Sequence, residues 1–469
     1  MTLLPPIPYP SSTPHLSLKP HPHKQPFALP TPTTTSTATP TALIVGAGLA
    51  GLAAAVHLHS SNTPFLLLEA SDGVGGRVRT DPLDGFLLDR GFQILLTAYP
   101  EARRLLHYPS LSLRPFYPGA LVYTGDAFHR VADPFRRPLH ALASLANPVG
   151  TLPDKLLTGI ARLLASARSD ADILSAADES TIAHRLRSSG FSPSIVDRFF
   201  KPFLSGIFFD PDLSTTSRLF DFVLKCLALG DNVLPAAGIG AIPDQLAGRL
   251  PRGSVRLNSR VVEVGFGSSG VASTVRLESG DVLAAELGLV VAVDQPEAER
   301  LLPRLAAATT SGGKPVRSTV CIYFSADRAA VEDPILILNG SGRGIVNNMF
   351  FATNVAPSYG PEGKVLVSVS LVGAYDGRSD DDLTAEVARE LGGWFGDREV
   401  GSWRHLRTYR IAFAQPDQTP PTDLVGKDPR VGDGVYVCGD YRSSATFDGA
   451  LVSGRRAAEA LVEDRALLH

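Results

Sequence analysis

The stretch "TALIVGAGLAGLAAAVHLHS", Thr41 to Ser60, is the part of this sequence that is most informative about its fold. It begins with a short β-prone run, Ala42 to Val45, passes through glycines at 46, 48 and 51, and becomes an alanine-rich helix. "FLLLE", Phe65 to Glu69, then supplies a second strand. A strand, a glycine turn, a helix and a strand in this order predict a Rossmann-like βαβ unit that binds a dinucleotide. We therefore expect an α/β fold.

Each glycine of the turn has a mechanical task in such a unit. Gly46 permits the tight turn, Gly48 lets a pyrophosphate approach the backbone, and Gly51 lets helix and strand pack closely. The helix N-terminus offers N–H groups to the phosphates, and a carboxylate at the strand end can accept the ribose hydroxyls. Glycine turns also serve ordinary packing, which is the alternative for the motif taken alone. The predicted cofactor contacts from these two segments are Gly46, Ala47, Gly48, Leu49, Ala50, Gly51, Glu69 and Ala70.

A second glycine segment, "GVGGRVRT", follows at Gly73 to Thr80. The paired Gly75 and Gly76 let the main chain pass close to a ligand, and Arg77 adds a positive charge beside a diphosphate or an electron-rich ring. With this segment the sequence resembles the flavin-dependent amine oxidase superfamily, which includes amine oxidases, protoporphyrinogen oxidases and carotenoid desaturases and isomerases. The resemblance implies that the dinucleotide is FAD and that these three residues line it. An NAD-dependent dehydrogenase is the alternative from the first motif alone.

The C-terminal stretch "GVYVCGDYRSSATFDGALVSGRR" extends the resemblance. In relatives the aspartate matched by Asp440 holds the ribityl and pyrophosphate region, and the helix that opens around Gly449 and Ala450 lies by the flavin pyrimidine. A third stretch, which ends in "SRVVEV", resembles the one before the adenine-contacting strand. The resemblance therefore adds five predicted FAD contacts, Val261, Gly439, Asp440, Gly449 and Ala450.

The length of 469 residues favours two domains. We expect a discontinuous FAD-binding domain built from 41–115, 236–300 and 431–465. A mixed α+β substrate-binding domain should comprise 116–235, which reads as largely helical, and 301–430, where strand-like runs surround a helix near 381–395. Five phenylalanines of the helical region either line a substrate cavity or belong to the core, namely Phe199, Phe200, Phe203, Phe208 and Phe209.

Residues 1–40 differ in composition from the rest, because they are rich in Pro, Ser and Thr and contain no acid. Such a segment cannot bury enough apolar surface to fold, and it is typical of a disordered transit peptide for a plastid. A disordered tail without a targeting role is the alternative. The longest apolar stretch, Ala42 to Val56, is too short and too rich in glycine for a transmembrane helix, so only peripheral membrane contact stays open.

The composition limits the classes of partner. The formal net charge of −3 gives no basic excess, so nucleic acid is not an expected partner. Cys226, Cys321 and Cys438 form no closely spaced pair, which disfavours a zinc site and favours three buried apolar side chains. We expect no metal, and no residue stands out from the sequence as a catalytic acid or base.

Two departures from the amine oxidases bear on the substrate. Thr319 stands where those enzymes commonly carry a lysine near the flavin, with Lys314 the nearest lysine, and Thr446 stands in place of a cage aromatic. "AYPEARRLL", Ala98 to Leu106, instead looks like the carotenoid desaturase branch. The resemblance implies an FAD-dependent oxidoreductase that removes hydride from a hydrophobic isoprenoid-type molecule, or a related isomerase, with quinone or oxygen as electron acceptor. An amine or protoporphyrinogen oxidase and a non-catalytic flavin-binding protein are the alternatives.

Overall fold

The computed structural model describes residues 41–267, 272–303, 317–432 and 434–467. These residues belong to one compact unit, Thr39–His469. The predicted transit peptide and Lys314 lie outside the described residues.

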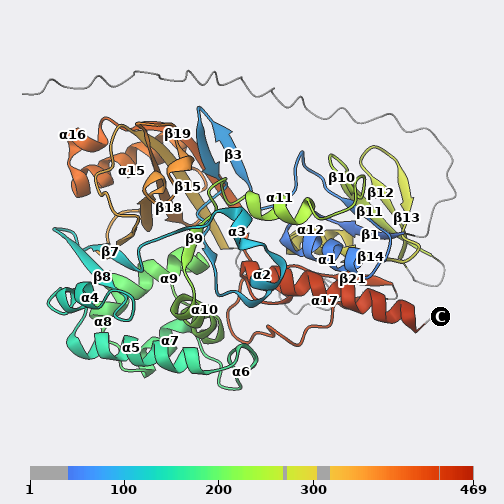
Figure 1. The fold of residues 1–469 in the computed structure, drawn as a ribbon, viewed down its shortest axis with the longest axis horizontal. Helices are drawn as coiled ribbons and strands as arrows, with labels where there is room; N and C mark the ends of the chain where they lie inside the picture. Colours follow the sequence, from blue (N-terminus) through green and yellow to red (C-terminus); the bar gives the residue numbers. More distant parts are fainter. Residues whose placement is uncertain (1–40, 268–271, 304–316, 433, 468–469) are drawn as a thin grey trace, which may run out of the picture. The chain divides into compact units, whose positions relative to one another are not determined.

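A six-stranded sheet contains the strands that flank the glycine turn (Figure 1). Its order is β10-β2-β1-β14-β21-β20, and every pair is parallel except β20 with β21. The strands are β1 (Ala42–Val45), β2 (Phe65–Leu68), β10 (Val255–Arg256), β14 (Gly288–Val291), β20 (Arg430–Gly432) and β21 (Val435–Val437). Segments from the beginning, the middle and the end of the chain therefore meet in one sheet.

The two faces of this sheet bury alternate residues of each strand. Ile44 of β1 belongs to the core that contains α1 (Leu49–Ser60) and α17 (Phe447–Ala466), and Val45 belongs to the core on the opposite face. The helices α1 and α17 pack against each other (Figure 1) so closely that a Cβ at Gly454 would lie 2.0 Å from the Ala50 carbonyl oxygen.

A three-stranded antiparallel sheet and one helix contribute to the opposite face. The sheet consists of β11 (Val261–Phe266), β12 (Ala272–Leu277) and β13 (Val282–Ala284), and the helix is α12 (Gln295–Leu301).

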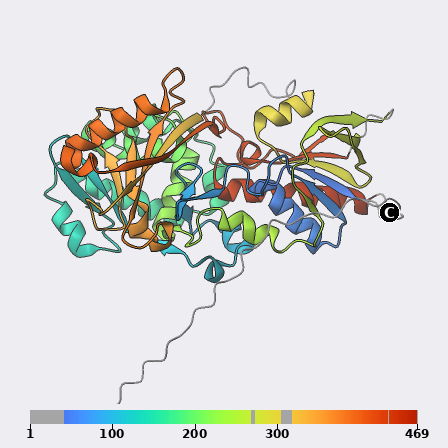
Figure 2. The same ribbon diagram turned by 90° about the horizontal axis from the view of Figure 1, so that it is seen from above.

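A seven-stranded sheet lies at a different end of the described residues from the six-stranded one (Figure 2). In the order of the sheet it contains β19 (Arg404–Gln415), β15 (Arg317–Ala326), β18 (Val365–Val372), β17 (Asn348–Phe351), β16 (Leu336–Asn339), β7 (Gly119–Tyr123) and β8 (Phe128–Ala132). Helix α15 (Asp380–Phe395), predicted near 381–395, packs on this sheet through Leu383, Val387 and Leu391.

The chain between β8 and β9 (Asn232–Leu234) is mostly helical. Its helices are α4 (Pro138–Ser144), α5 (Leu152–Ala167), α6 (Asp170–Leu174), α7 (Ile182–Ser188), α8 (Pro193–Ile195), a π-helical turn (Val196–Phe200), α9 (Lys201–Phe208) and α10 (Ser217–Leu229). The expectation of a largely helical region from residue 116 missed β7 and β8, which form an antiparallel hairpin whose first strand pairs with β16, more than two hundred residues away in the chain.

Shorter elements connect these parts. They are β3 (Thr80–Leu83), β4 (Phe86–Asp89), β5 (Leu95–Leu96), α2 (Pro100–Leu105), α3 (Tyr108–Leu111), β6 (Arg114–Pro115), α11 (Ala241–Ala247), α14 (Ala352–Val355) and α16 (Asp397–Val400). Among the described residues, no helix combines the length and the apolar character that a membrane crossing requires.

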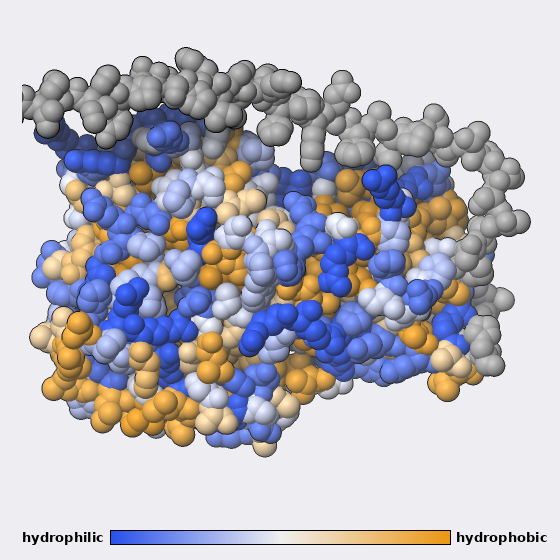
Figure 3. Space-filling view, viewed as in Figure 1, coloured by the Kyte–Doolittle hydropathy of each residue, from blue (hydrophilic) through white to orange (hydrophobic). Residues whose placement is uncertain are grey.

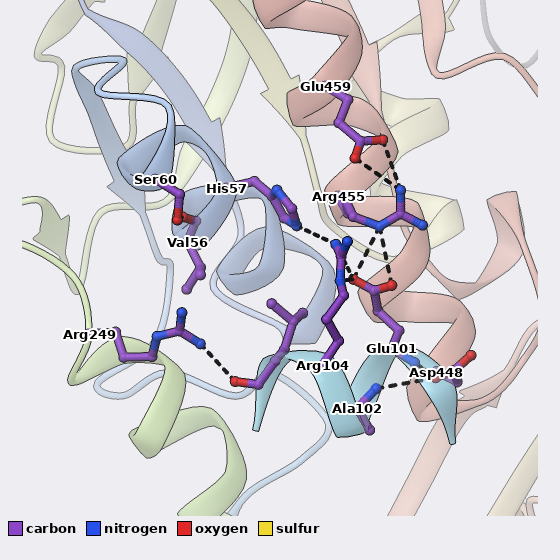
Figure 4. A network of polar contacts seen from close by, with 11 residues as sticks. Val56, His57, Ser60, Glu101, Ala102, Arg104, Arg249, Asp448, Arg455 and Glu459 are labelled. Atoms are coloured by element: carbon purple, nitrogen blue, oxygen red, sulfur yellow. Dashed lines mark hydrogen bonds and ion pairs between the residues drawn. The ribbon is translucent and has the colours of Figure 1, made fainter. Parts of the chain in front are cut away.

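A polar network fixes α1, α2 and α17 to one another (Figure 4). The Glu101 carboxylate of α2 pairs with Arg104 of the same helix and with Arg455 of α17. Arg104 Nη2 lies 2.9 Å from His57 Nε2 of α1. The Asp448 carboxylate accepts hydrogen bonds from the first N–H groups of α2, including that of Glu101 at 2.7 Å. The network therefore holds the two long helices whose first turns frame the candidate site.

Candidate functional site

A cavity of about 460 Å³ lies at the carboxyl edge of the six-stranded sheet. The segments that follow four parallel strands all line it: Gly46 follows β1, Glu69 follows β2, Asp294 follows β14 and Asp440 follows β21. In open α/β sheets, ligands bind outside the carboxyl ends of parallel strands. The position of the cavity therefore agrees with a ligand site.

Eleven of the sixteen predicted contact residues line this cavity, and five do not. The lining residues are Gly46, Gly48, Leu49, Ala50, Glu69, Gly75, Gly76, Arg77, Gly439, Asp440 and Ala450. The other five, Ala47, Gly51, Ala70, Val261 and Gly449, lie in the neighbouring backbone or core and are not part of its wall.

Gly46 and Gly51 are required by the packing of the chain itself. Gly46 has φ +100°, a conformation that L side chains rarely adopt. A Cβ at Gly51 would lie 1.9 Å from the Gly46 carbonyl oxygen, which no side chain tolerates. The turn therefore brings α1 directly against the end of β1.

Gly48 has no such requirement, and this distinguishes it from the other two glycines. Its backbone has φ −70° and ψ 179°, which any residue adopts, and a Cβ there would meet no protein atom within 4 Å. The absent side chain leaves open space in the cavity wall. A ligand that approaches the backbone at this position accounts for the glycine, because the protein does not.

The second glycine segment runs beside the first. The Gly75 N–H donates to the Ala47 carbonyl oxygen at 2.8 Å, and Gly48 and Gly75 form a parallel bridge. Two stretches of main chain with little side-chain cover therefore face the same cavity.

The Glu69 carboxylate is buried directly after β2, and protein groups already donate hydrogen bonds to most of its acceptor positions. Oε2 accepts a hydrogen bond from the Ala47 N–H at 2.7 Å, and Oε1 accepts from the N–H and the hydroxyl of Ser71. A carboxylate offers about four acceptor positions. Glu69 therefore fastens the glycine turn to β2 and keeps about one acceptor position for a ligand.

Arg77 and Asp440 form an ion pair in the cavity wall. Arg77 Nη2 lies 2.8 Å from Asp440 Oδ2, Nη1 donates to the Ala414 carbonyl oxygen at 2.6 Å, and the guanidinium lies over the Phe413 ring. Burial acts to lower the pKa of Arg77, but the charge of Asp440 and its hydrogen bond raise the pKa above the usual value. The positive charge expected at Arg77 is thus present and balanced by the predicted carboxylate.

The first turns of two helices contribute to the cavity wall, and that of α17 is capped by the Thr446 hydroxyl, which accepts from the Gly449 N–H at 2.9 Å. Leu49 and Ala50 of the first turn of α1 line the cavity, and that turn carries no acidic residue and no side-chain cap. Phe447 and Ala450 of the first turn of α17 line it from the other side. The positive ends of helix dipoles and unpaired N–H groups favour a phosphate or another anion.

Three buried amide atoms in the cavity wall have no hydrogen-bond partner in the described part of the chain, namely Gln93 Oε1, Asn232 Oδ1 and Asn348 Nδ2. The Gln93 amide is oriented, because its Nε2 donates to the carbonyl oxygens of Arg77 and Arg90. An unsatisfied buried polar group costs about 1–3 kcal/mol, so these atoms indicate a bound partner. The cavity therefore fits a ligand that is anionic at one part and polar along its length, as FAD is.

A second cavity, of about 560 Å³ and with a mainly apolar wall, adjoins the first. The two share Phe203, Val223, Leu227 and Asn232. Of the five predicted phenylalanines, Phe199, Phe200 and Phe203 line the second cavity, Phe203 and Phe209 line the first, and Phe208 is a core residue.

The first cavity also contains residues that sequence reasoning missed. Arg260, Asp294 and Glu297 line it. Asp294 follows the end of β14 as Glu69 follows β2, so the strand-end rule used for Glu69 could have found it. Thr319 and Thr446, the positions compared with amine oxidases, both line this cavity, and no lysine does so among the described residues.

Neither of two further kinds of site, a metal centre and a reactive thiol, occurs among the described residues. No cluster of His, Cys, Asp and Glu that could hold a metal ion occurs in ranges 41–267, 272–303, 317–432 and 434–467. All three cysteines are free and buried, as predicted, and burial raises the pKa of the Cys226 and Cys438 thiols to about 12 and that of Cys321 to about 11.

Comparison with known proteins defines the class. The family described as flavin containing amine oxidoreductase matches residues 49–462, so the chain belongs to this family. The protein is an FAD-dependent oxidoreductase with a mixed α/β fold that matches the structures of FAD amine oxidases.

Individual relatives have low sequence identity to this chain but match it over most of its length. The chloroplastic/chromoplastic 15-cis-phytoene desaturase of Glycine max is 23% identical, over 91% of this chain and 80% of the relative. The 15-cis-phytoene desaturase of Synechococcus elongatus is also 23% identical, over 89% of this chain and 95% of the relative. Among solved structures, cyclohexylamine oxidase from Brevibacterium oxydans has a TM-score of 0.64 at 18% identity and covers 91% of this chain and 99% of its own, which establishes similarity of fold.

Proposed function

We propose that FAD lies in the 460 Å³ cavity, on a Rossmann-like unit formed by β1, α1 and β2. The N–H groups at the start of α1 would face the diphosphate, and Glu69 would accept a ribose hydroxyl with its remaining acceptor position. The Arg77–Asp440 pair and the start of α17 would hold the ribityl and flavin part. The open space beside Gly48 supports this placement.

We assign 41–115, 236–300 and 431–465 to FAD binding, and 116–235 and 301–430 to substrate binding. The assignment is supported by the six-stranded sheet, whose strands come from the first three segments, and by the second cavity, whose wall comes mainly from the helices between β8 and β9.

The substrate in this proposal is an elongated apolar molecule of the isoprenoid polyene type, and the reaction is a desaturation or a related isomerisation. When bound, FAD supplies the chemistry by accepting a hydride from a substrate C–H. The protein binds the apolar chain, excludes water and fixes one carbon near the cofactor. The observation that carries the proposal is the wall shared by the two cavities, because Phe203, Val223 and Leu227 connect an apolar pocket to the cofactor cavity.

The cofactor cavity offers little to an amine. Thr319 donates its hydroxyl hydrogen bond to the Leu371 carbonyl oxygen at 2.7 Å, and a cage aromatic is replaced by Thr446, whose hydroxyl caps α17. Both threonines are therefore engaged by the protein. This supports a hydrocarbon-like substrate over an amine.

The setting we propose is the plastid, at or near its membranes, with a quinone or oxygen as electron acceptor. The plant relatives with desaturase activity are named as chloroplastic/chromoplastic, and the leader composition agrees with such a location. The relative from Synechococcus elongatus is named 15-cis-phytoene desaturase, and its name gives no location.

Anaerobic reduction of the bound flavin tests the proposal. Purified holoprotein is mixed with linear isoprenoid polyenes, with primary and secondary amines, or with porphyrinogens, and the flavin absorbance is followed. We expect loss of the oxidised flavin spectrum with a polyene alone. Bleaching by an amine or a porphyrinogen and not by a polyene would assign the protein to the corresponding oxidases, and no bleaching by any compound would favour a flavin-binding protein without turnover.

A further inference from the structure

Asn348 of β17 carries a buried hydrogen-bond donor that the described residues leave unused. The residue is 1% exposed and lines the cofactor cavity. Its Oδ1 accepts a hydrogen bond from Asn347 Nδ2 at 2.8 Å, whereas its Nδ2 has no hydrogen-bond partner in the part of the chain that the structure describes. A buried donor without a partner costs about 1–3 kcal/mol. A ligand atom that accepts from Nδ2 would remove this cost.

The orientation of this amide is fixed by the neighbouring residue. Asn347 Nδ2 donates to the Pro202 carbonyl oxygen at 2.9 Å as well as to Asn348 Oδ1. If the Asn348 amide were turned over, its N–H groups would face those of Asn347, and two donors cannot bond each other. Asn348 therefore keeps Oδ1 toward Asn347 and leaves Nδ2 for another partner.

Helix α9 makes room for these two amides. A Cβ at Gly206 would lie 2.8 Å from Asn348 Oδ1 and 3.0 Å from Asn347 Nδ2. Glycine inside a helix costs about 1 kcal/mol relative to alanine, and the backbone of Gly206 has no positive φ that would require it. The space that the amides occupy therefore accounts for the glycine.

Asn348 lies close to the junction of the two cavities. Phe203, one helical turn before Gly206 on α9, lines both cavities. Leu338, which pairs with Asn348 across the sheet, lines the cofactor cavity. A second buried amide atom without a partner, Asn232 Oδ1, belongs to a residue that also lines both cavities. The region of the junction thus offers one free donor and one free acceptor.

The outer part of the second cavity has a different character. Leu152, Leu156 and Ile160 of α5 line it where they reach the surface, and Figure 3 shows hydrophobic side chains gathered along the lower left edge, where Figure 1 places α4 and α5. Among the described residues that line this cavity, Asn232 alone has a buried side-chain atom without a partner. A long apolar ligand would therefore find such polar atoms only at the inner end of the passage.

The free donor of Asn348 belongs to the substrate side of the cofactor cavity. The Gln93 amide is held on the glycine segment by the Arg77 carbonyl oxygen, beside the predicted FAD contacts. Asn348 instead lies in the seven-stranded sheet, next to Leu338 and α9.

The chemistry of a donor limits the substrate. A hydrocarbon has no atom that accepts from Nδ2, and an ammonium group would bring a second donor. The oxygen of a hydroxyl or carbonyl group is an acceptor without a charge, so it suits an apolar cavity with a neutral amide.

We propose that the substrate is an oxygenated polyene and that Asn348 Nδ2 donates a hydrogen bond to its hydroxyl or carbonyl oxygen near the junction of the two cavities. This inference rests on the proposed function, because it names the substrate class of the same site. Asn348 determines which polyene binds and takes no part in the transfer of hydride.

Binding of three matched polyenes to the full-length holoprotein tests the inference. The probes share the geranylgeranyl chain and end in a hydrogen, a hydroxyl group or an aldehyde group. Perturbation of the flavin absorbance under anaerobic conditions gives each dissociation constant, and bleaching gives the rate of reduction. We expect the alcohol, the aldehyde or both to bind at least about tenfold more tightly than the hydrocarbon, the factor that one satisfied buried donor supplies.

Asn348→Leu should abolish this preference, because leucine has a similar shape and no donor, while the hydrocarbon binds at least as well as before. Gly206→Ala is a second variant, whose Cβ displaces the Asn348 amide without removing it, so the preference should also fall. Asn354→Leu is the matched control, since it removes an amide that donates to the Val331 carbonyl oxygen and lines neither cavity. It should keep the preference. Melting temperature and flavin content of each variant establish that it is folded.

Three results would overturn the inference: the unchanged protein binds the hydrocarbon as tightly as both oxygenated probes, Asn348→Leu keeps the preference, or Asn348→Leu shifts the reduction potential or the affinity of the flavin, which would assign the donor to FAD. If the oxygenated probes bind preferentially but reduce no flavin, the role of Asn348 stands and the proposed reaction is wrong. If the hydrocarbon reduces the flavin and the oxygen has no effect, the proposed reaction stands and this inference is wrong.

Discussion

The guanidinium of Arg77 lies 2.8 Å from the carboxylate of Asp440, and this ion pair joins two segments far apart in the chain in the wall of the 460 Å³ cavity. Asp440 is largely buried, whereas the Arg77 side chain keeps 37% of its surface exposed. Because each charge neutralises the other, the pair lets both groups lie in the cavity wall. It also fastens the segment that contains Arg77 to the segment that contains Asp440.

Arg77 and Asp440 should therefore depend on each other. Arg77→Met or Asp440→Asn alone should lower the free energy of unfolding by about 1–3 kcal/mol, a range reduced for the exposure of Arg77, because each leaves one charge unpaired. The double variant should lose less than the sum of the two. Denaturant unfolding of the four proteins measures the coupling, and strictly additive losses would mean that the pair contributes nothing to stability.

Glu69→Ala should weaken FAD binding by about tenfold to a hundredfold, which corresponds to the loss of one buried hydrogen-bond partner for the ribose and of the acceptor for the Ala47 N–H. Fluorescence titration of FAD into the apoprotein measures the change. Ser71→Ala is the matched control, since it removes a hydroxyl that contacts the same carboxylate, the Gly73 carbonyl oxygen and Arg79 but leaves the Glu69 carboxylate in place. Equal affinities in the Glu69 variant and the unchanged protein would place the ribose elsewhere.

The stability of the protein should depend on pH through Asp448. Burial, more than any other cause, raises the pKa of this carboxyl to about 6 from an ordinary value of 3.8. A carboxyl with a raised pKa stabilises the folded chain fully below the unfolded pKa, and this contribution is lost as pH rises to the folded value. As pH rises from about 4 to about 7, the free energy of unfolding of Asp448→Asn should therefore increase by about 2–3 kcal/mol relative to that of the unchanged protein. Thermal or denaturant unfolding across this range measures the difference, and a difference independent of pH would contradict the raised pKa.

The connection between the two cavities should be required for long substrates. Leu227→Trp adds bulk to a residue that lines both cavities, so it should lower turnover of a long polyene by at least about tenfold while FAD absorbance is unchanged. Leu227→Ala should retain turnover. Undiminished turnover in the tryptophan variant would show that the substrate reaches the cofactor by another route.

The sequence predicted the local features of the fold well, because they depend on neighbouring residues. The glycines of Gly46 to Gly51, the alanine-rich run of α1 and the apolar runs of β1, β2 and β14 each have a short-range physical cause, and the structure contains all of them. The resemblance to a flavin family, now established by the family match, supplied the cofactor.

Features that depend on distant partners could not be predicted from neighbouring residues. The strands β7 and β8 form a local hairpin, but their place at the edge of the seven-stranded sheet depends on the pairing of β7 with the distant β16. Val261 is a buried residue of β11, and its neighbour Arg260 lines the cavity, an arrangement that depends on how β11 packs. The occupied acceptor positions of Glu69 and the pairing of Arg77 with Asp440 likewise follow from tertiary contacts.

Comparison of Gly48→Val with Gly51→Val tests the placement of FAD most directly, through the FAD dissociation constant and the melting temperature of the apoprotein. A Cβ at 48 would have no protein atom within 4 Å and the backbone there is allowed, whereas a Cβ at 51 would lie 1.9 Å from the Gly46 carbonyl oxygen. We predict that Gly48→Val folds with an unchanged apoprotein melting temperature and binds FAD at least about a hundredfold more weakly, since its side chain fills the space of the ligand, and that Gly51→Val is destabilised. FAD affinity in Gly48→Val equal to that of the unchanged protein would contradict the proposed cofactor site.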